Sequence, residues 1–207
     1  MQVRLLAVVL VALALMIGCS SNQQPQTTSE QKSQPAAPKA VETQSGREAF
    51  QRLYVAARGW AGDIKPFRVQ SEPVADSNGQ AGKAAVWRAS FASPSRRAIK
   101  TYLWSGAGES GQRGVTPGSE DAYNPNNSST QVFDVAFLKI DTDKAYDVAQ
   151  QHGGEKLIKK DPAQPVNYLL EWDSRHNKLI WHVSYGSSPS DTKLRVAVDA
   201  TTGSFLP

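Results

Sequence analysis

The sequence has little of the chemistry on which metal and redox sites depend. It contains one Cys and three His among its 207 residues, so it offers neither a disulfide within the chain nor a zinc site built on paired Cys or His. The histidines, His152, His176 and His182, stand apart in different predicted elements and show no His-x-x-x-His spacing. We therefore expect no metal and no cofactor.

Motifs that organise an enzyme's active site are also scarce. There is no Gly-x-Ser-x-Gly nucleophile elbow and no long alternation of strands and helices. Asp141 and Asp143 could begin a calcium loop, but the Glu that completes such a loop is missing, and an N-cap with a negative first helical turn explains both acids. We expect no enzyme. A hydrolase remains an alternative, because a Ser-His-Asp triad assembles only in three dimensions.

The chain also has little excess of one charge over the other. Lys and Arg number 23 against 19 Asp and Glu, a formal net charge of +4 at pH 7, and the two signs are interspersed along the chain. A nucleic-acid-binding surface would show a basic stripe with interleaved aromatic residues. We therefore expect no nucleic-acid partner.

The amino terminus has the sequence pattern of a secretory signal peptide. Arg4 supplies a positive charge, and an unbroken apolar run extends from Leu5 to Ile17 before Gly18. This run is about 13 residues long, short of the roughly 20 that a helix needs to cross a bilayer. The pattern predicts a signal peptide over residues 1–18 and not a permanent membrane span.

The end of this signal carries the only Cys of the chain. Met16, Ile17, Gly18 and Cys19 resemble the bacterial lipobox. The resemblance implies cleavage before Cys19 and attachment of fatty acids such as palmitate to it, giving a lipoprotein held in the membrane of the cell envelope. Ser20, where Asp would favour the inner membrane, implies the outer membrane facing the periplasm if the cell is Gram-negative. The alternative is a plain signal peptide with an incidental Cys.

Composition divides the rest of the chain into segments. Residues 19–44 hold the lipidated Cys and a run of Gln, Ser, Thr, Pro and Ala that predicts a disordered linker. Residues 105–130 are rich in Gly, Ser, Asn and Pro and predict a flexible loop. Two folded units are expected on either side of this loop, over residues 45–104 and 131–207.

These two units look like copies of each other. The segment around Trp87 reads Val-Trp-Arg-Ala-Ser-Phe and that around Trp181 reads Ile-Trp-His-Val-Ser-Tyr. With one residue inserted in the second copy, Pro94 then aligns with Pro189. An apolar stripe at helical spacing precedes each Trp segment, formed by Phe50, Leu53, Tyr54 and Ala57 in the first copy and by Ala145, Val148, Ala149 and His152 in the second. We interpret the pattern as an internal repeat.

Alternating apolar residues predict the strands. They are residues 67–72, 83–91 and 98–104 in the first unit, and residues 168–172, 179–185 and 194–198 in the second. A further strand is expected over residues 132–138, before the helix that starts at Asp141, and a last short one around Phe205. The predicted fold class is α+β, with two tandem units of one helix and a three-stranded antiparallel sheet.

The end of the second unit resembles a known family. Val198-Asp199-Ala200 followed by Thr202-Gly203, a helix start at residues 141–145 and the pair Gly153-Gly154 are similar to PepSY and PepSY-like domains of bacterial envelope proteins. The resemblance covers residues 140–205 and is weak in the first unit. It implies a small, non-catalytic module that binds or regulates a protein or peptide partner, such as a peptidase.

Three residues are candidates for partner contact. Trp104, Asp199 and Gly203 belong to the segments in which the two units differ at their ends. Trp104 is expected to be exposed, because exposed aromatic side chains mark binding patches. A structural explanation competes for Asp199 and Gly203, which suit a chain reversal. Binding is expected at a sheet face or an edge strand; the alternative is an envelope structural or assembly factor without a discrete ligand.

Overall fold

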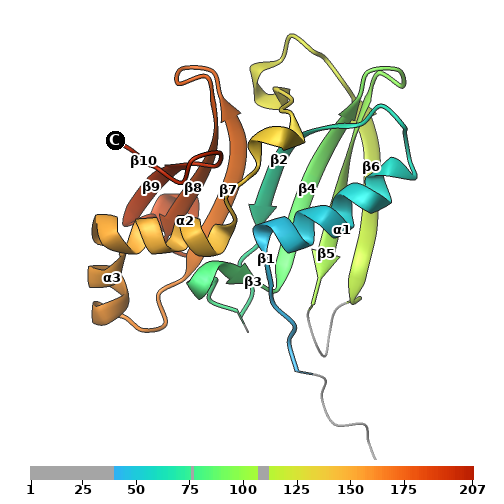
Figure 1. Cartoon of the computed structure of the whole chain (residues 1–207). Coiled ribbons are helices and arrows are strands. Elements are labelled where there is room, and N and C mark those ends of the chain that lie inside the picture. The colour runs from blue at the N-terminus through green and yellow to red at the C-terminus, as the bar shows by residue number, and fades with distance from the viewer. Residues whose placement is uncertain (1–39, 76, 107–111) are drawn as a thin grey trace, which may run out of the picture. The chain divides into compact units, whose positions relative to one another are not determined.

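The computed structural model describes residues 40–75, 77–106 and 112–207, and these residues form one α+β unit (Figure 1). The helices are α1 (Gly46–Arg58), α2 (Thr142–Ala149) and α3 (Glu155–Lys160). The strands are β1 (Gln44–Ser45), β2 (Lys65–Ser71), β3 (Lys83–Ala84), β4 (Val86–Ser93), β5 (Ala98–Ser105), β6 (Gly114–Ala122), β7 (Val166–Asp173), β8 (Lys178–Tyr185), β9 (Leu194–Asp199) and β10 (Phe205–Leu206). Within these residues no helix is long and apolar enough to cross a membrane.

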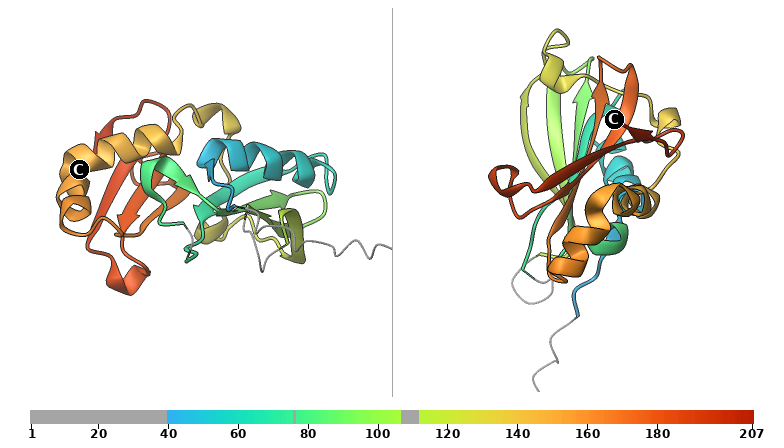
Figure 2. Two further views of the ribbon diagram at one scale, coloured as in Figure 1. Left: turned by 90° about the horizontal axis from the view of Figure 1, so that it is seen from below. Right: turned by 90° about the vertical axis from the view of Figure 1, so that its left-hand side faces the viewer.

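Eight strands make one antiparallel sheet in the order β10-β9-β8-β7-β2-β4-β5-β6. The predicted unit 131–207 contributes β7 to β10, and the predicted unit 45–104 contributes β2, β4 and β5, with β6 added at their outer edge. The two sets join where β2 pairs with β7, with Val69 opposite Leu170. Figure 2 shows α1 and α2 on the same side of this sheet. One face of the sheet is therefore covered by helices and the other is open.

The repeat seen in the sequence recurs in the hydrogen bonding. The indole Nε1 of Trp87 donates to the carbonyl of Gln44 at 2.9 Å, and that of Trp181 donates to the carbonyl of Ile140 at 3.0 Å. Each acceptor directly precedes the N-cap residue of a helix. The two rings meet edge to face with centroids 6.4 Å apart, in the centre of the covered face.

Local side-chain bonds explain where the two long helices begin. Ser45 and Glu48 form a capping box at the start of α1. Asp141 is the N-cap of α2, as the sequence predicts, and its carboxylate also accepts hydrogen bonds from the Ser45 hydroxyl at 2.7 Å and the Arg47 amide at 2.9 Å. One carboxylate thus holds the N-termini of both helices together.

The covered face forms one continuous hydrophobic core. Residues from both predicted units, 45–104 and 131–207, belong to it. Its largest fully buried side chains include Trp87, Trp181 and Tyr168. The Tyr168 hydroxyl donates to the Gly79 carbonyl at 2.6 Å and accepts from the Gly82 amide, so a loop of the first unit is tied to a strand of the second.

Two predicted segments differ from the structure. The prediction of a flexible loop over residues 105–130 is wrong where the chain forms β6, which pairs with β5 along its length. β6 is largely exposed, so its sequence lacks the apolar alternation that predicts a strand. The strand expected over residues 132–138 is also wrong. This segment follows the short turn η2 (Ser128–Thr130) and is a loop that contains the turn η3 (Val135–Phe137), and its apolar residues Phe133 and Leu138 are buried individually.

The second helical segment is interrupted. After α2 the chain forms a π turn, η4 (Gln150–Gly154), in which Gly153 has a φ of 112°. The chain then continues as α3. His152, which the sequence places on the apolar stripe of one helix, lies in this turn and stacks on Phe205 at a centroid distance of 3.8 Å.

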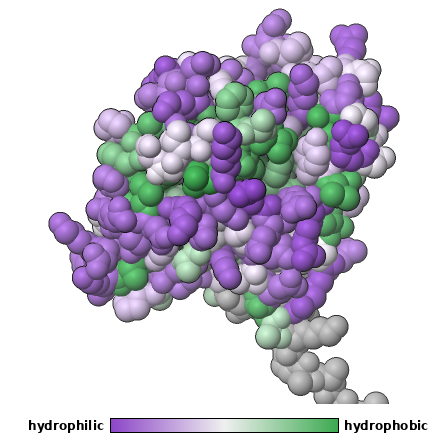
Figure 3. Space-filling model, in the orientation of Figure 1, coloured by the Kyte–Doolittle hydropathy of each residue, from purple (hydrophilic) through white to green (hydrophobic). Residues whose placement is uncertain are grey.

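Large apolar side chains also reach the surface of the helix-bearing face, where Figure 3 shows hydrophobic residues among hydrophilic ones. Phe137 is 43% exposed and its ring rests on Trp172 with centroids 5.4 Å apart. Val55, Val135 and Phe205 are exposed as well.

Candidate functional site

The open face of the sheet is polar near its centre. Successive residues of a strand point to opposite faces, so the residues that alternate with the core residues of β2, β7, β8 and β9 lie on this face. They include Arg68, Gln70, Glu171, His182, Ser184 and Arg195, and Glu72 directly follows β2. The sequence predicts this placement for His182, which alternates with the buried Trp181.

Two ion pairs neutralise the acids of this face. Arg68 lies 3.0 Å from Glu171, and Arg88 lies 3.1 Å from Glu72. The amide of Gln70 donates to the same Glu72 carboxylate at 3.0 Å. All these groups are part-exposed, so each pair contributes little to stability. Their effect is to give each carboxylate its own cationic partner.

A pocket of about 260 Å³ opens beside these pairs. Its roof is the loop of residues 186–193 between β8 and β9, which includes the turn η5 (Pro189–Asp191). Figure 2 shows this loop on the side of the sheet away from the helices. The pocket is lined by Gln70, Ser71, Glu72, Pro73, Asn167, Tyr168, Leu169, His182, Ser184, Ser187, Ser188, Pro189, Thr192 and Arg195.

Hydrogen bonds hold the roof loop in place. The side-chain amide of Asn167 donates to the Gly186 carbonyl at 2.6 Å, and the Asp191 carboxylate accepts from the Ser187 hydroxyl at 3.0 Å. The bonds from Ser187 lower the pKa of Asp191, with burial acting in the opposite direction. The loop is therefore anchored at both ends of its turn.

His182 forms part of the pocket wall. Its side chain is 18% exposed, and its Nε2 atom is 3.9 Å from Glu171 Oε1. Burial lowers the pKa of His182 and Arg195 lowers it further, while Glu171 and Asp173 act in the opposite direction; the net shift is downward. The imidazole is therefore mainly neutral at pH 7.

Arg195 stands at the pocket with an exposed side chain. Its Nε donates to the Ser184 hydroxyl at 3.3 Å. Among the residues that the structure describes, no carboxylate lies within ion-pair distance of its guanidinium group. Arg195 thus differs from Arg68 and Arg88, which both have acidic partners.

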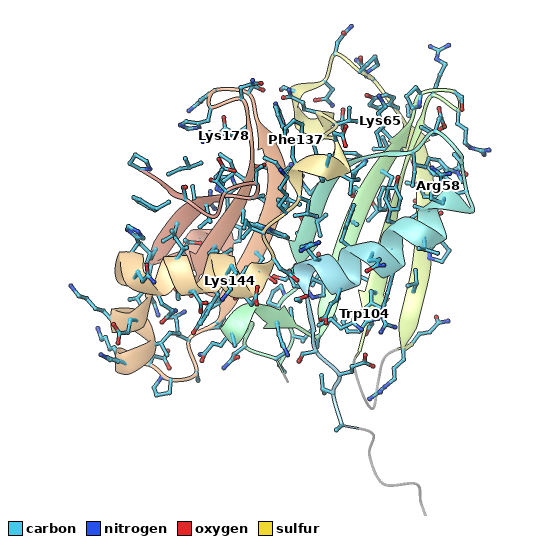
Figure 4. All side chains as sticks on the ribbon, in the orientation of Figure 1. Arg58, Lys65, Trp104, Phe137, Lys144 and Lys178 are labelled. Atoms are coloured by element: carbon cyan, nitrogen blue, oxygen red, sulfur yellow. The ribbon has the colours of Figure 1, made fainter. Side chains whose placement is uncertain are left out.

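The three residues that the sequence predicts for partner contact lie outside this pocket. Trp104 is 2% exposed, toward the end of β5 (Figure 4), so its expected exposure is wrong. It points to the covered face opposite Trp87, and β6 shields its strand from the sheet edge. Trp104 is buried because it belongs to the hydrophobic core of that face together with Trp87.

Asp199 and Gly203 form a chain reversal between β9 and β10. The buried Asp199 carboxylate accepts from the amides of Thr201 at 2.8 Å and Thr202 at 3.2 Å and from Lys178 Nζ at 2.7 Å. Gly203 has a φ of 78°, which favours glycine. The geometry supports the structural explanation for both residues, and neither lines the pocket.

The other expected sites are dispersed. Cys19 lies outside the described residues. His176 is 3.2 Å from Asp173 in the turn between β7 and β8. Within the described part of the chain, no cluster of His, Cys, Asp and Glu suits a metal ion, and neither His152 nor His182 is hydrogen bonded to a Ser or Asp.

Comparisons with known proteins give a fold likeness. Neither a protein-family model nor a curated protein matches the sequence. The crystal structure of a candidate lipoprotein from Clostridium difficile 630 is similar, with a TM-score of 0.53 over 77% of this chain and 90% of the other. The sequence identity is 9%, so the similarity shows a shared fold alone.

Proposed function

We propose that this chain is a non-catalytic lipoprotein of the cell envelope that binds a protein or peptide partner on the open face of its sheet. The pocket beneath residues 186–193 is the observation that carries the proposal. The PepSY-like resemblance of residues 140–205 adds regulation of a peptidase as the role of such binding. The anchor is lipid on Cys19, in the outer membrane facing the periplasm if the cell is Gram-negative.

The anchor is supported by the signal grammar of residues 1–18 and by the description of the structural relative as a candidate lipoprotein. Each acyl CH₂ contributes about 0.8 kcal/mol on insertion, so several chains hold a protein where one would be marginal. Lipidation of Cys19 would therefore keep the protein at the membrane without a spanning helix.

The sheet edges are less suited than the face to binding an extended peptide. At one edge, β6 carries Pro117, which has no amide hydrogen to donate, and a register shift interrupts its pairing with β5. At the other edge, β10 has two residues, Phe205 and Leu206, and Pro207 follows. Proline, bulges and short strands are the features that protect edges from adding another strand.

The pocket offers groups for recognition. His182, Arg195, Asn167 and several hydroxyls surround a floor that includes Leu169. A nucleophile held by a general base would be needed for hydrolysis, and no such hydrogen-bonded pair with His182 occurs in the described residues. These contacts support binding over turnover.

Labelling of cells with an alkyne analogue of palmitate tests the anchor. The wild-type protein should be labelled and found in the membrane fraction, and Cys19→Ala should lose the label and leave that fraction. A conservative change next to the Cys, Ser20→Ala, is the matched control and should keep both properties. An unlabelled wild type, or a Cys19→Ala protein that stays in the membrane, contradicts lipid anchoring.

Photocrosslinking in intact cells tests the partner. A benzophenone amino acid replaces Leu169 in the pocket, and the control carries it at Lys144, which is exposed on α2 (Figure 4). The Leu169 position should yield a discrete protein adduct that the Lys144 position does not give. Adducts with lipid and peptidoglycan alone, or identical adducts from both positions, would remove the support for a partner on this face.

A further inference from the structure

We propose that the pocket binds a peptide carboxylate, with the guanidinium group of Arg195 as its ionic partner. The inference rests on the proposed function, because it assigns the chemistry of the group that a partner inserts beneath residues 186–193. It makes Arg195 the residue that determines specificity for an acidic group.

The distribution of charge singles out Arg195. Glu72 and Glu171 are each neutralised by an Arg of the same face, at 3.1 and 3.0 Å. The pocket side of the face therefore retains one full positive charge, on Arg195, for which the described residues supply no acidic partner. A ligand with one negative charge would give Arg195 the acidic partner that Arg68 and Arg88 already have.

The orientation of Arg195 suits a carboxylate. Its Nε donates to the Ser184 hydroxyl at 3.3 Å, and the described residues provide no hydrogen bond to its two terminal nitrogens. A planar guanidinium group with two free donors binds both oxygens of a carboxylate in a fork. Ser184 acts as a positioning residue, because its contact limits the rotation of the Arg195 side chain.

His182 adds a donor without adding a full charge. Burial lowers its pKa, so the imidazole is mainly neutral at pH 7 and can donate one hydrogen bond. The groups that face it are Glu171 and Asp173 on β7 and Arg195 on β9. A dianionic phosphate would bring two negative charges to the one cation without an acidic partner, Arg195, so the singly charged carboxylate is favoured.

The size of the pocket limits what enters with the carboxylate. A volume of about 260 Å³ is below the range of roughly 300 to 1,000 Å³ that holds drug-sized ligands. Pro73, Leu169 and Pro189 supply apolar surface beside the charged groups. This combination fits one residue of a peptide, whose carboxylate comes from either an Asp or Glu side chain or the chain's own C-terminus.

Two matched pairs of peptides separate these sources. Acetyl-Gly-Ala-Leu with a free carboxylate is compared with its amide, and acetyl-Gly-Glu-Leu amide is compared with its Gln counterpart. The full-length lipidated protein is titrated with each peptide in detergent micelles. Binding is followed by ¹⁵N NMR at the Arg195 Nε–H and at the amides of residues 186–193.

The acid of at least one pair should bind about tenfold or more tightly than its neutral counterpart, as a charge-assisted fork predicts. Arg195→Gln should remove this preference. Arg175→Gln, which removes the same charge from the exposed turn between β7 and β8, should retain it. Equal affinity for acids and neutral peptides, or a preference that survives in Arg195→Gln, overturns the inference.

The two proposals fail differently. If crosslinks from position 169 capture a protein while acids and amides bind equally, the carboxylate chemistry is wrong and the proposed function stands. If carboxylate peptides bind through Arg195 but crosslinking captures no protein, the pocket recognises a small acid and the proposed partner is wrong.

Ser184→Ala, which frees Arg195 to rotate, should weaken the acid preference severalfold while leaving the affinity for the neutral peptides unchanged.

Discussion

Trp87 and Trp181 make the same hydrogen bond in the two halves of the chain. Each indole reaches the carbonyl that precedes a helix N-cap, and the two rings contact each other in the core. A buried carbonyl that loses its donor costs more free energy than the bond contributes. Both tryptophans therefore have a structural role in the core.

Trp181→Phe should lower the free energy of unfolding by about 2 kcal/mol or more, because the Ile140 carbonyl loses its donor and a cavity remains. Trp172→Phe is the control: Trp172 is part-exposed and rests on Phe137, so about 1 kcal/mol or less is expected. Urea denaturation followed by circular dichroism measures both. Equal losses in the two variants would contradict the role given to the indole bond.

Asp199 shows how a local turn sets a pH dependence. Burial acts to raise the pKa of Asp199, but the bond from Lys178 and the amides of Thr201 and Thr202 lower it more. A carboxyl group whose folded pKa lies below its unfolded value stabilises the fold above the unfolded pKa. That stability is lost as the pH falls through the lower, folded value.

Asp199→Asn should therefore destabilise the protein by about 2 kcal/mol at pH 7. The difference from wild type should begin to shrink as the pH falls below about 4, near the pKa of an unfolded Asp. It should be lost as the pH falls through the lower pKa of the folded carboxyl group. Denaturation midpoints measured from pH 7 to pH 2.5 test this. A difference that stays constant over this range would show that the charge of Asp199 does not matter.

The start of α1 packs closely against the start of α2. A Cβ atom at Gly46 would lie 2.7 Å from the Trp181 ring and 2.8 Å from the Thr142 methyl group. The Gly46 amide also donates to the Thr142 hydroxyl at 2.8 Å. A residue without a side chain is therefore required where the two helices meet.

Gly46→Ala should destabilise the fold by about 1 to 3 kcal/mol, because overpacking of a buried contact outweighs alanine's better helix propensity of roughly 1 kcal/mol. Gly62→Ala is the matched control. A Cβ at Gly62 meets nothing within 4 Å, so its effect should be neutral or slightly stabilising. Thermal melting of the two variants would refute the close-packing argument if Gly46→Ala melted at or above the wild-type temperature.

Among the elements, α1 and the strands with one buried face could be predicted from the sequence, because apolar periodicity reports which side of an element is covered. β6 could not, since both of its faces are largely exposed and its stability comes from backbone bonds to β5. For residues 132–138, apolar spacing predicted a strand where the structure has a loop. Phe133 and Leu138 are buried one at a time by a loop that happens to place apolar residues at intervals.

The two halves of the molecule depend on each other. The sheet is continuous through the pairing of β2 with β7, and the core spans both halves. Separation would expose the edge of β7 and leave Trp181 without its contact to Trp87. A half of this size buries a smaller share of its surface than the whole chain does and is marginal by itself.

A chain of residues 131–207 should therefore lack a cooperative thermal transition, and mixing it with a chain of residues 37–130 should restore one. Near-ultraviolet circular dichroism, which reports on the packed tryptophans, provides the measurement. If the isolated half melted cooperatively at the temperature of the whole protein, the two halves would be independent units and the shared core would be of little importance to stability.

The sequence by itself determined the local features: the α+β composition, the N-cap at Asp141, the paired Trp segments and the placement of His182 opposite Trp181. These follow from interactions within one turn or along one strand. Tertiary structure alone decided the strand order, the burial of Trp104 and the pocket that unites Arg195, His182 and Leu169. Contacts between residues as distant as Ser45 and Asp141, 96 positions apart, create these features, and no local pattern records which distant strand becomes a neighbour.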